Sequence, residues 1–347
     1  AGMTMRRKNN VYSLQKIAET AGVSTATVSR ALSRPELVKE ITREKVLSAL
    51  KALNIPMEEM QAGTPGASER QKPVILVLLT TPNENLAEPD VLKGIYEVAE
   101  KNGYICVNLY REYIQKLSPD VLKELLLQLN VIGIYVLTYL DYSILSLFSS
   151  MVPIVQSGDV NSRFESCLVM PDYYKLAMAA TNHLIAQSCK DIAAIIVDTK
   201  ISASSAKKRK GFCDALINAG RPIEASRIIE LPKVDYLMTV NAVSSLLKRY
   251  PSVDGLFCGT DLYAAAALFI CHQYNRPVPE SIKIVGFDDT IYSSIVTPKI
   301  TTTRHDRYYS GYIGCELLIE RINNPTLPNE KIIQEGELII RGSTQQH

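Results

Sequence analysis

From residue 74 onward, short apolar runs alternate with stretches that have helical periodicity. We expect strands at 74–79, 104–109, 132–138, 152–156, 192–197, 226–231, 254–258 and 282–286. We expect helices near 89–102, 119–129, 141–149, 172–187, 206–219, 235–249 and 261–274. This alternation is typical of βαβ units, which form parallel sheets covered by helices on both faces. Because so many strands exceed the needs of one doubly wound domain, the pattern predicts two lobes with a cleft between them.

Residues 13 to 32, SLQKIAETAGVSTATVSRAL, have the pattern of two short helices joined by a turn. The apolar face of the first helix stops at Gly22, where a left-handed turn residue is expected. Ser24 is well placed to cap the second helix, whose apolar face must meet that of the first across the turn. The apolar positions are Leu14, Ile17, Ala18 and Ala21 in the first helix and Val28, Ala31 and Leu32 in the second. The pattern predicts a helix-turn-helix.

The second of these helices has the features of a recognition helix. Thr25, Ala26, Thr27 and Arg30 point outward near its N-terminal end, where such a helix contacts base edges in the major groove. Residues 42–53 form a third amphipathic helix, so three short helices can share one small core. Positive charge is also concentrated here: residues 1–60 hold ten Lys and Arg against six Asp and Glu, whereas the rest of the chain holds 28 against 30. This small domain alone has the basic bias that a phosphate-binding surface requires.

Several classes of protein are disfavoured by what the sequence lacks. No G-x-G-x-x-G turn, Walker A loop or G-x-S-x-G elbow is present, and the four histidines are far apart. The seven cysteines are scattered and never form a C-x-x-C pair, which argues against a disulfide framework and a zinc site. No apolar run is long enough for a membrane span or a signal peptide. We therefore expect a cytoplasmic protein that is no enzyme and holds neither cofactor nor metal.

Motifs distributed over residues 11–344 resemble those of the LacI/GalR family of bacterial repressors. They are VSTATVSRAL at 23–32, TREKV at 42–46, RKGF at 209–212, TD at 260–261, VPESIKIVGFDD at 278–289, TPKITTTRHD at 297–306 and ELIIRGST at 337–344. The resemblance implies a small all-α helix-turn-helix headpiece followed by an α/β two-lobed core of the periplasmic-binding-protein type. The expected boundaries are 11–57 for the headpiece, 58–73 for the linker, 74–160 with 300–325 for the N-terminal core lobe, and 161–299 with 326–347 for the C-terminal core lobe.

The resemblance also assigns roles to residues of the recognition helix. Thr25, Ala26 and Arg30 match the positions that contact bases in the family. Arginine can bond a guanine in a bidentate way, and a methyl group of Ala or Thr can meet a thymine methyl. For Thr27 and Ser29 we expect phosphate contacts or exposure to solvent. The alternative for Arg30 is a phosphate contact alone.

The linker at 58–73 departs from the family pattern of a short hinge helix with an Ala and a minor-groove Leu. Met60 and Gly63 occupy those two positions. Gly63, Pro65 and Gly66 disfavour a helix by about 1 kcal/mol for each glycine and about 3 for an interior proline. The sequence therefore predicts a flexible, degenerate hinge.

For the core, the resemblance implies an effector site between the lobes. Arg209, in KKRKGF, and Asp288, the first carboxylate of GFDD, would clamp a polar ligand such as a sugar or nucleoside. The alternative for Arg209 is membership of a solvated basic run. Thr260, Asn83 and Asp172 are further candidates for effector contacts, although family residues at neighbouring positions have been replaced.

Taken with the family resemblance, the sequence predicts a homodimeric regulator, most simply a repressor, that binds double-stranded operator DNA. A small effector would alter its affinity for DNA, and the sequence leaves open whether the effector releases DNA or promotes binding. An alternative is a co-regulator that has a vestigial effector site and binds DNA only beside a neighbouring activator protein. A transport receptor would keep the two-lobed core but would have no helix-turn-helix.

Overall fold

The computed structural model describes residues 14–25, 27–28, 31, 38, 40–53, 55, 72–80 and 88–345. They belong to two compact units, Ala1–Lys72 and Pro73–His347, each of which is described by itself. The linker prediction for 58–73 lies outside the described residues except at Lys72 and Pro73.

The first unit has the expected helix-turn-helix core. Helix α1 (Leu14–Ala21) ends at Gly22, whose φ of +65° is the left-handed conformation that glycine favours. The hydroxyl of Ser24 accepts the amide hydrogen of Thr27 at 3.1 Å and so caps the following helical segment. Ser24 thus has the capping role predicted from the sequence. Helix α3 (Glu40–Ala52) completes a core that buries Ile17, Ala18, Ala21, Val28, Ala31, Val46, Ala49, Leu50 and Ile55.

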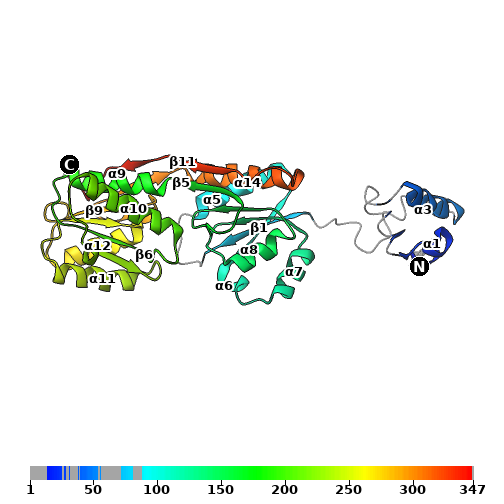
Figure 1. The fold of residues 1–347 in the computed structure, drawn as a ribbon, viewed down its shortest axis with the longest axis horizontal. Helices are drawn as coiled ribbons and strands as arrows, with labels where there is room; N and C mark the ends of the chain where they lie inside the picture. Colours follow the sequence, from blue (N-terminus) through cyan, green and yellow to red (C-terminus); the bar gives the residue numbers. More distant parts are fainter. Residues whose placement is uncertain are drawn as a thin grey trace, which may run out of the picture. The chain divides into compact units, whose positions relative to one another are not determined.

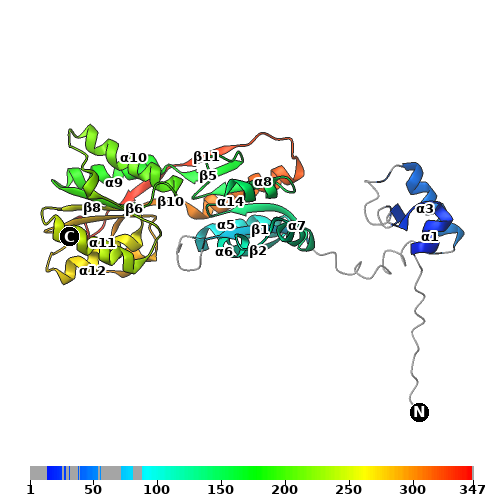
Figure 2. The same cartoon turned by 60° about the horizontal axis from the view of Figure 1, so that its bottom comes forward.

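The second unit contains two six-stranded sheets, and Figures 1 and 2 show helices on both faces of each. The first sheet has the order β11-β5-β4-β3-β1-β2, and all of its pairings are parallel. Its strands are β1 (Val74–Leu79), β2 (Ile105–Tyr110), β3 (Val131–Val136), β4 (Ile154–Ser157), β5 (Cys167–Pro171) and β11 (Lys331–Gln334). Helices α5 (Glu88–Lys101) and α14 (Arg307–Asn323) cover one face. Helices α6 (Arg111–Ile114), α7 (Pro119–Gln128) and α8 (Tyr142–Ser149) cover the other. We call this sheet with its helices the first lobe.

The second sheet has the order β12-β10-β9-β8-β6-β7, and only β12 runs antiparallel to its neighbour. Its strands are β6 (Ile192–Val197), β7 (Ile228–Leu231), β8 (Gly255–Cys258), β9 (Lys283–Phe287), β10 (Thr301–His305) and β12 (Gly336–Ile339). Helices α9 (Tyr173–Ala186) and α10 (Ala203–Asn218) cover one face, and α11 (Tyr236–Arg249) and α12 (Asp261–Gln273) cover the other. Two short elements, η2 (Ala225–Arg227) and α13 (Ile291–Ile295), complete this second lobe.

Glycines allow the closest helix pairs of each lobe to approach. A Cβ atom on Gly311 of α14 would lie 1.9 Å from the carbonyl oxygen of Val91 in α5. In the second lobe, a Cβ atom on Gly211 of α10 would lie 2.3 Å from the carbonyl oxygen of Tyr174 in α9. Both distances are far below van der Waals contact, so α5 packs on α14 and α10 on α9 only because these side chains are absent.

The two-lobed α/β architecture is the predicted one, but three boundaries within it were wrong. Strand β5 belongs to the first lobe although 161–299 were assigned to the second, and β10 belongs to the second lobe although 300–325 were assigned to the first. Strand β11 lies beside β5 in the first lobe in both views (Figures 1 and 2), although 326–347 were assigned to the second. The chain therefore crosses between the lobes after β5, after β10 and after β11. These strands are only four or five residues long and carry little periodic signal, which is why the sequence misplaced these crossings.

Candidate functional site

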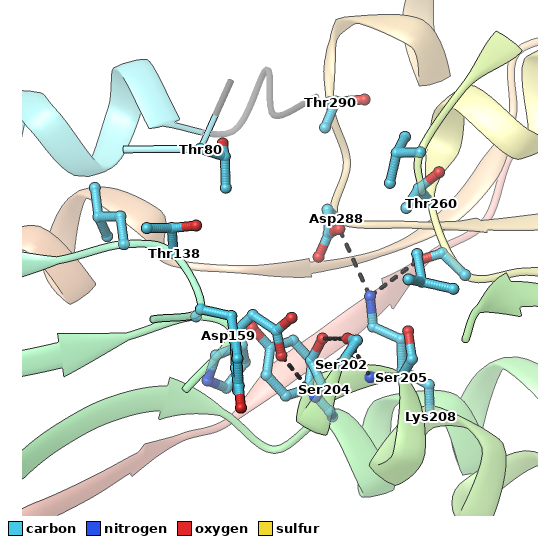
Figure 3. Close-up of a pocket in the computed structure, with 18 of the residues that line it drawn as sticks. Thr80, Thr138, Asp159, Ser202, Ser204, Ser205, Lys208, Thr260, Asp288 and Thr290 are labelled. Carbon is cyan, nitrogen blue, oxygen red and sulfur yellow. Dashed lines mark hydrogen bonds and ion pairs between the residues drawn. The ribbon is translucent and has the colours of Figure 1, made fainter. Parts of the chain in front are cut away.

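A cleft of about 280 Å³ lies where the carboxyl ends of strands from both sheets face each other. Parallel α/β sheets commonly bind ligands at this end of their strands. Figure 3 shows Thr80, Thr138 and Asp159 of the first lobe on one side, Ser205, Lys208 and Thr260 of the second lobe on the other, and Asp288 between them. Hydroxyl groups dominate the polar lining: Thr80, Thr138, Ser157, Ser202, Ser204, Ser205, Thr260, Thr290 and Ser310.

Lys208 is the buried cation of the cleft. Helix α10 begins after Ser202, whose hydroxyl accepts the amide hydrogen of Ser205 at 3.1 Å. This start turns Lys208 onto the buried face of the helix, where its side chain is only 6 % exposed. Its Nζ donates to the carbonyl oxygen of Gly259 at 2.9 Å and lies 3.8 Å from the Asp288 carboxylate. The same Nζ lies 3.9 Å from the centre of the Phe287 ring, a cation–π distance.

Asp288 follows β9 in a strained turn. Its φ is +89° and that of Asp289 is +46°, a conformation that costs non-glycine residues about 1 to 3 kcal/mol each. Arg307 stabilises the turn from the start of α14, because its guanidinium donates to the carbonyl oxygens of both aspartates. The same guanidinium lies 2.9 Å from the carboxylate of Asp90 in α5. Arg307 therefore connects the first lobe to the backbone beside the cleft.

The side chain of Asp289 stabilises the same turn through contacts within the second lobe. Burial opposes ionisation of its carboxyl group, but hydrogen bonds from Arg341, Ser293 and Arg304 outweigh burial and hold its pKa below the usual value. The carboxylate lies 2.7 Å from Arg341 and 2.6 Å from Arg304. The strained geometry of Asp288 is thus fixed from both sides.

Asp159 links the two lobes across the cleft. It lies in the first-lobe loop after β4, and its Oδ1 accepts the amide hydrogen of Ser204 at 3.1 Å. Ser204 is in the first turn of α10, where amide groups lack partners within the helix and the helix dipole favours negative charge. Burial raises the pKa of Asp159, and the hydrogen bond from Ser204 only partly offsets that effect.

Asp261 is buried and His305 is partly buried at the second-lobe side of the cleft. Asp261 opens α12 and accepts the hydroxyl hydrogen of Thr302 at 2.6 Å and the amide hydrogen of Thr290 at 2.6 Å. Burial raises the pKa of Asp261 to about 7 despite these donors. His305 ends β10, and burial lowers its pKa to about 4, so its imidazole is neutral near pH 7.

Of the effector residues predicted from the sequence, Asp288 and Thr260 line the cleft. Thr260 also caps α12, since its hydroxyl accepts the amide hydrogen of Tyr263 at 3.3 Å. Asp172 lies outside the lining of the cleft and caps α9 instead, with its carboxylate accepting the amide hydrogen of Lys175 at 3.0 Å. Asn83 lies outside the described residues.

The structure places Arg209 outside the lining of the cleft and its neighbour Lys208 within it. The Nε of Arg209 lies 3.4 Å from Glu230, and its half-exposed side chain does not line the cleft. The spacing along α10 could have identified Lys208, which precedes the buried Gly211 and Phe212 by three and four residues and so shares their face. Asp159 and His305 were missed because no local pattern marks a loop residue or a strand end as part of a cleft.

In the headpiece, Thr25 and Thr27 lie in the helical segment that follows Ser24, and the side chain of Thr25 is exposed. The Thr27 hydroxyl lies 2.8 Å from that of Ser24, which places it at the helix start. Ala26, Ser29 and Arg30, the other predicted DNA contacts, lie outside the described residues.

The described part of the chain lacks two features. Within it, no three His, Cys, Asp or Glu side chains are grouped so as to hold a metal ion. None of its helices is both long and apolar enough to cross a membrane.

Comparisons with known proteins match both units. Residues 13–55 match the family described as "Bacterial regulatory proteins, lacI family", and residues 181–344 match the "Periplasmic binding protein-like domain". The HTH-type transcriptional regulator GntR of Escherichia coli strain K12 is 28% identical over 325 residues, which cover 93% of this chain and 95% of that protein. Catabolite control protein A of Priestia megaterium is 28% identical over 331 residues, which cover 95% and 98%. The solved complex of transcriptional regulator CelR with cellobiose has a TM-score of 0.71 and 24% identity over 96% of this chain and 99% of that one, and so shares the fold.

Proposed function

Because the chain belongs to the LacI family of bacterial regulatory proteins, we propose that a small polyhydroxylated effector binds between its core lobes and thereby changes the affinity of its headpiece for operator DNA. The chain is a DNA-binding transcriptional regulator with an effector-binding core. We place it in the cytoplasm with the DNA it regulates and take repression as its simplest mode.

The contact between Asp159 and α10 carries the proposed coupling. Asp159 of the first lobe holds the amide of Ser204 in the second lobe, and Lys208 lies one helical turn further along the same helix. A ligand that bonds Lys208 and Asp288 enters directly beside this contact between the lobes. Its binding energy therefore favours one arrangement of the lobes over others, which is what an effector must do to shift a conformational equilibrium.

The lining supports a sugar or a nucleoside as the effector. Hydroxyl side chains and carboxylates suit the hydroxyl groups of such ligands, and 280 Å³ is at the small end of ligand-binding cavities. The relative CelR was solved with cellobiose. The VSTATVSRAL and ELIIRGST motifs look closest to those of the cytidine repressor, which favours a nucleoside such as cytidine.

On the DNA side, we assign base contacts to Thr25, Ala26 and Arg30 and phosphate contacts to Thr27 and Ser29. A homodimer would supply two headpieces for the two halves of a pseudo-palindromic operator. Exposed apolar side chains on neighbouring helices of the second lobe support such a dimer. They are Tyr236 and Leu237 on α11, Phe269 on α12, and Ile291 and Ile295 on α13.

A ligand screen with the full-length chain tests the effector site. D-Ribose, D-glucose, cellobiose, cytidine and adenosine are added while the thermal midpoint of unfolding is recorded. We expect at least one of them to raise the midpoint of the wild type, since a ligand that binds only the folded state stabilises it. The same compound should have no effect on Lys208→Met. If no compound raises the midpoint, the proposed effector class is wrong.

Dimerisation is tested separately by sedimentation of the wild type and Leu237→Asp. The wild type should sediment as a dimer, and a charge within an apolar contact should shift the variant toward monomer. A monomeric wild type at micromolar concentration would contradict the proposed assembly.

A further inference from the structure

Two residues that line the effector cleft each have a buried polar atom without a hydrogen-bond partner in the described part of the chain. These atoms are Oγ1 of Thr138 in the first lobe and Nδ1 of His305 in the second. A buried group left unpaired destabilises a fold, and native proteins retain few of them. Two such atoms on opposite sides of one cleft indicate partners that arrive from outside the chain.

The Thr138 hydroxyl is the stronger indication of a ligand, because the whole residue is buried and a buried hydroxyl normally has a partner. Thr138 lies two residues after the end of β3 and has no exposed surface. Figure 3 shows its hydroxyl directed into the cavity, with Thr80 above it and Asp159 below. Hydroxyls across the cleft are already paired: that of Ser202 accepts from the Ser205 amide and contacts the Ser204 hydroxyl at 3.0 Å. The Thr138 hydroxyl, in contrast, has no hydrogen-bond partner among the described residues and can still bond a ligand.

We propose that Thr138 is the first-lobe anchor of the effector and selects a ligand that presents a hydroxyl group to it. This inference rests on the proposed effector site. A hydroxyl partner can donate and accept, so one polyol can satisfy Thr138 and the neutral His305 together. An uncharged partner is favoured there because a buried charge requires an opposite charge, and the buried Lys208 is already paired with Asp288. Because Thr138 has no exposed surface in this arrangement, a ligand reaches its hydroxyl only when the lobes move relative to each other.

Thr181 provides a matched control for Thr138, because it is a buried threonine whose hydroxyl does have a partner. Thr181 is also fully buried, but its hydroxyl donates to the carbonyl oxygen of Ala177 at 2.8 Å within α9, away from the cleft. Replacing either residue by valine removes a hydroxyl and keeps the shape. Thr181→Val loses a hydrogen bond to the Ala177 carbonyl oxygen, whereas Thr138→Val removes a group that has no partner to lose.

The experiment measures thermal midpoints of the full-length wild type, Thr138→Val, Thr138→Ser and Thr181→Val, alone and with D-ribose, D-glucose, cellobiose, cytidine and adenosine. Without ligand, Thr138→Val should melt at or above the wild-type midpoint and Thr181→Val below it. With a compound that stabilises the wild type, Thr138→Val should bind about three- to tenfold more weakly, the loss of one hydrogen bond. Thr138→Ser and Thr181→Val should bind as the wild type does.

Two results would overturn the proposal. One is a midpoint for free Thr138→Val as low as that of Thr181→Val, which would mean that the hydroxyl has a structural partner. The other is wild-type affinity of Thr138→Val for a compound that binds the cleft. Failure of every compound to stabilise the wild type would count against the proposed effector instead, and the comparison of the free variants would still decide the state of the Thr138 hydroxyl.

Discussion

The two walls of the cleft differ in how their polar groups are satisfied. On the second-lobe wall, Lys208 is paired with Asp288 and Gly259, and Asp261 accepts from Thr290 and Thr302. On the first-lobe wall, Asp159 bonds only across the cleft to α10, and the Thr138 hydroxyl has no partner among the described residues. Apart from Nδ1 of His305, these second-lobe groups therefore have partners before a ligand arrives. The first lobe gains bonds only when the lobes close, and this difference is how ligand binding can become a change of conformation.

The largest effect on stability should come from removing the ammonium group of Lys208 on the second-lobe side of the cleft. Lys208→Met leaves the mostly buried Asp288 carboxylate without its cation, so the free energy of unfolding should fall by about 3 kcal/mol and the response to ligand should vanish. The matched variant Arg209→Met removes a surface ion pair with Glu230 and should change stability by less than about 1 kcal/mol. Urea denaturation of both variants measures this. Equal losses would mean that the pair of Lys208 with Asp288 contributes no more to stability than the surface pair of Arg209 with Glu230.

A smaller effect should appear in the pH dependence of stability through Asp261. Its pKa of about 7 in the folded protein exceeds the value of about 3.9 expected for an unfolded chain. The folded state therefore holds a proton that the unfolded chain has lost, so this group lowers stability as pH rises from about 4 to 7. Relative to wild type, Asp261→Asn should gain about 2 kcal/mol of unfolding free energy between pH 5 and pH 7.

Denaturation curves at pH 5, 6 and 7 measure that gain. A stability difference between the wild type and Asp261→Asn that stays constant with pH would show that Asp261 titrates in its ordinary range. Asp261 would then be an ionised carboxylate near pH 7, and Thr290 and Thr302 would donate to a charged group and not to a neutral carboxyl group.

The smallest effect should be at the contact from the first lobe. Asp159→Ala removes the acceptor for the Ser204 amide, whose hydrogen exchange should accelerate by about three- to tenfold, the loss of about 1 kcal/mol. The neighbouring Ser205 amide is held by Ser202 within its own lobe and provides the control. Acceleration of both amides to the same extent would indicate fraying of α10 and not the loss of a link between lobes.

Some regions of this molecule can be predicted from sequence and others cannot, and the difference has a physical cause. The buried strands β1 and β6 are continuous apolar runs, and the Gly22 turn and Ser24 cap have local signals, so these features were predicted from the residues. The positions of β5 and β11 depend on pairing between segments far apart in the chain. The cleft behaves likewise: Asp288 follows a recognisable strand, whereas Asp159 and Thr138 acquire their roles only when loops from two sheets meet.

Thermodynamic coupling between the cleft and the DNA tests the central claim most directly. Operator duplexes would be selected from a random-sequence library by the full-length chain, and their affinity measured with and without a compound that binds the cleft. We predict a change of at least about fivefold in operator affinity, and by reciprocity the same factor in the affinity for the compound when operator is present. Unchanged operator affinity at saturating compound would contradict the account.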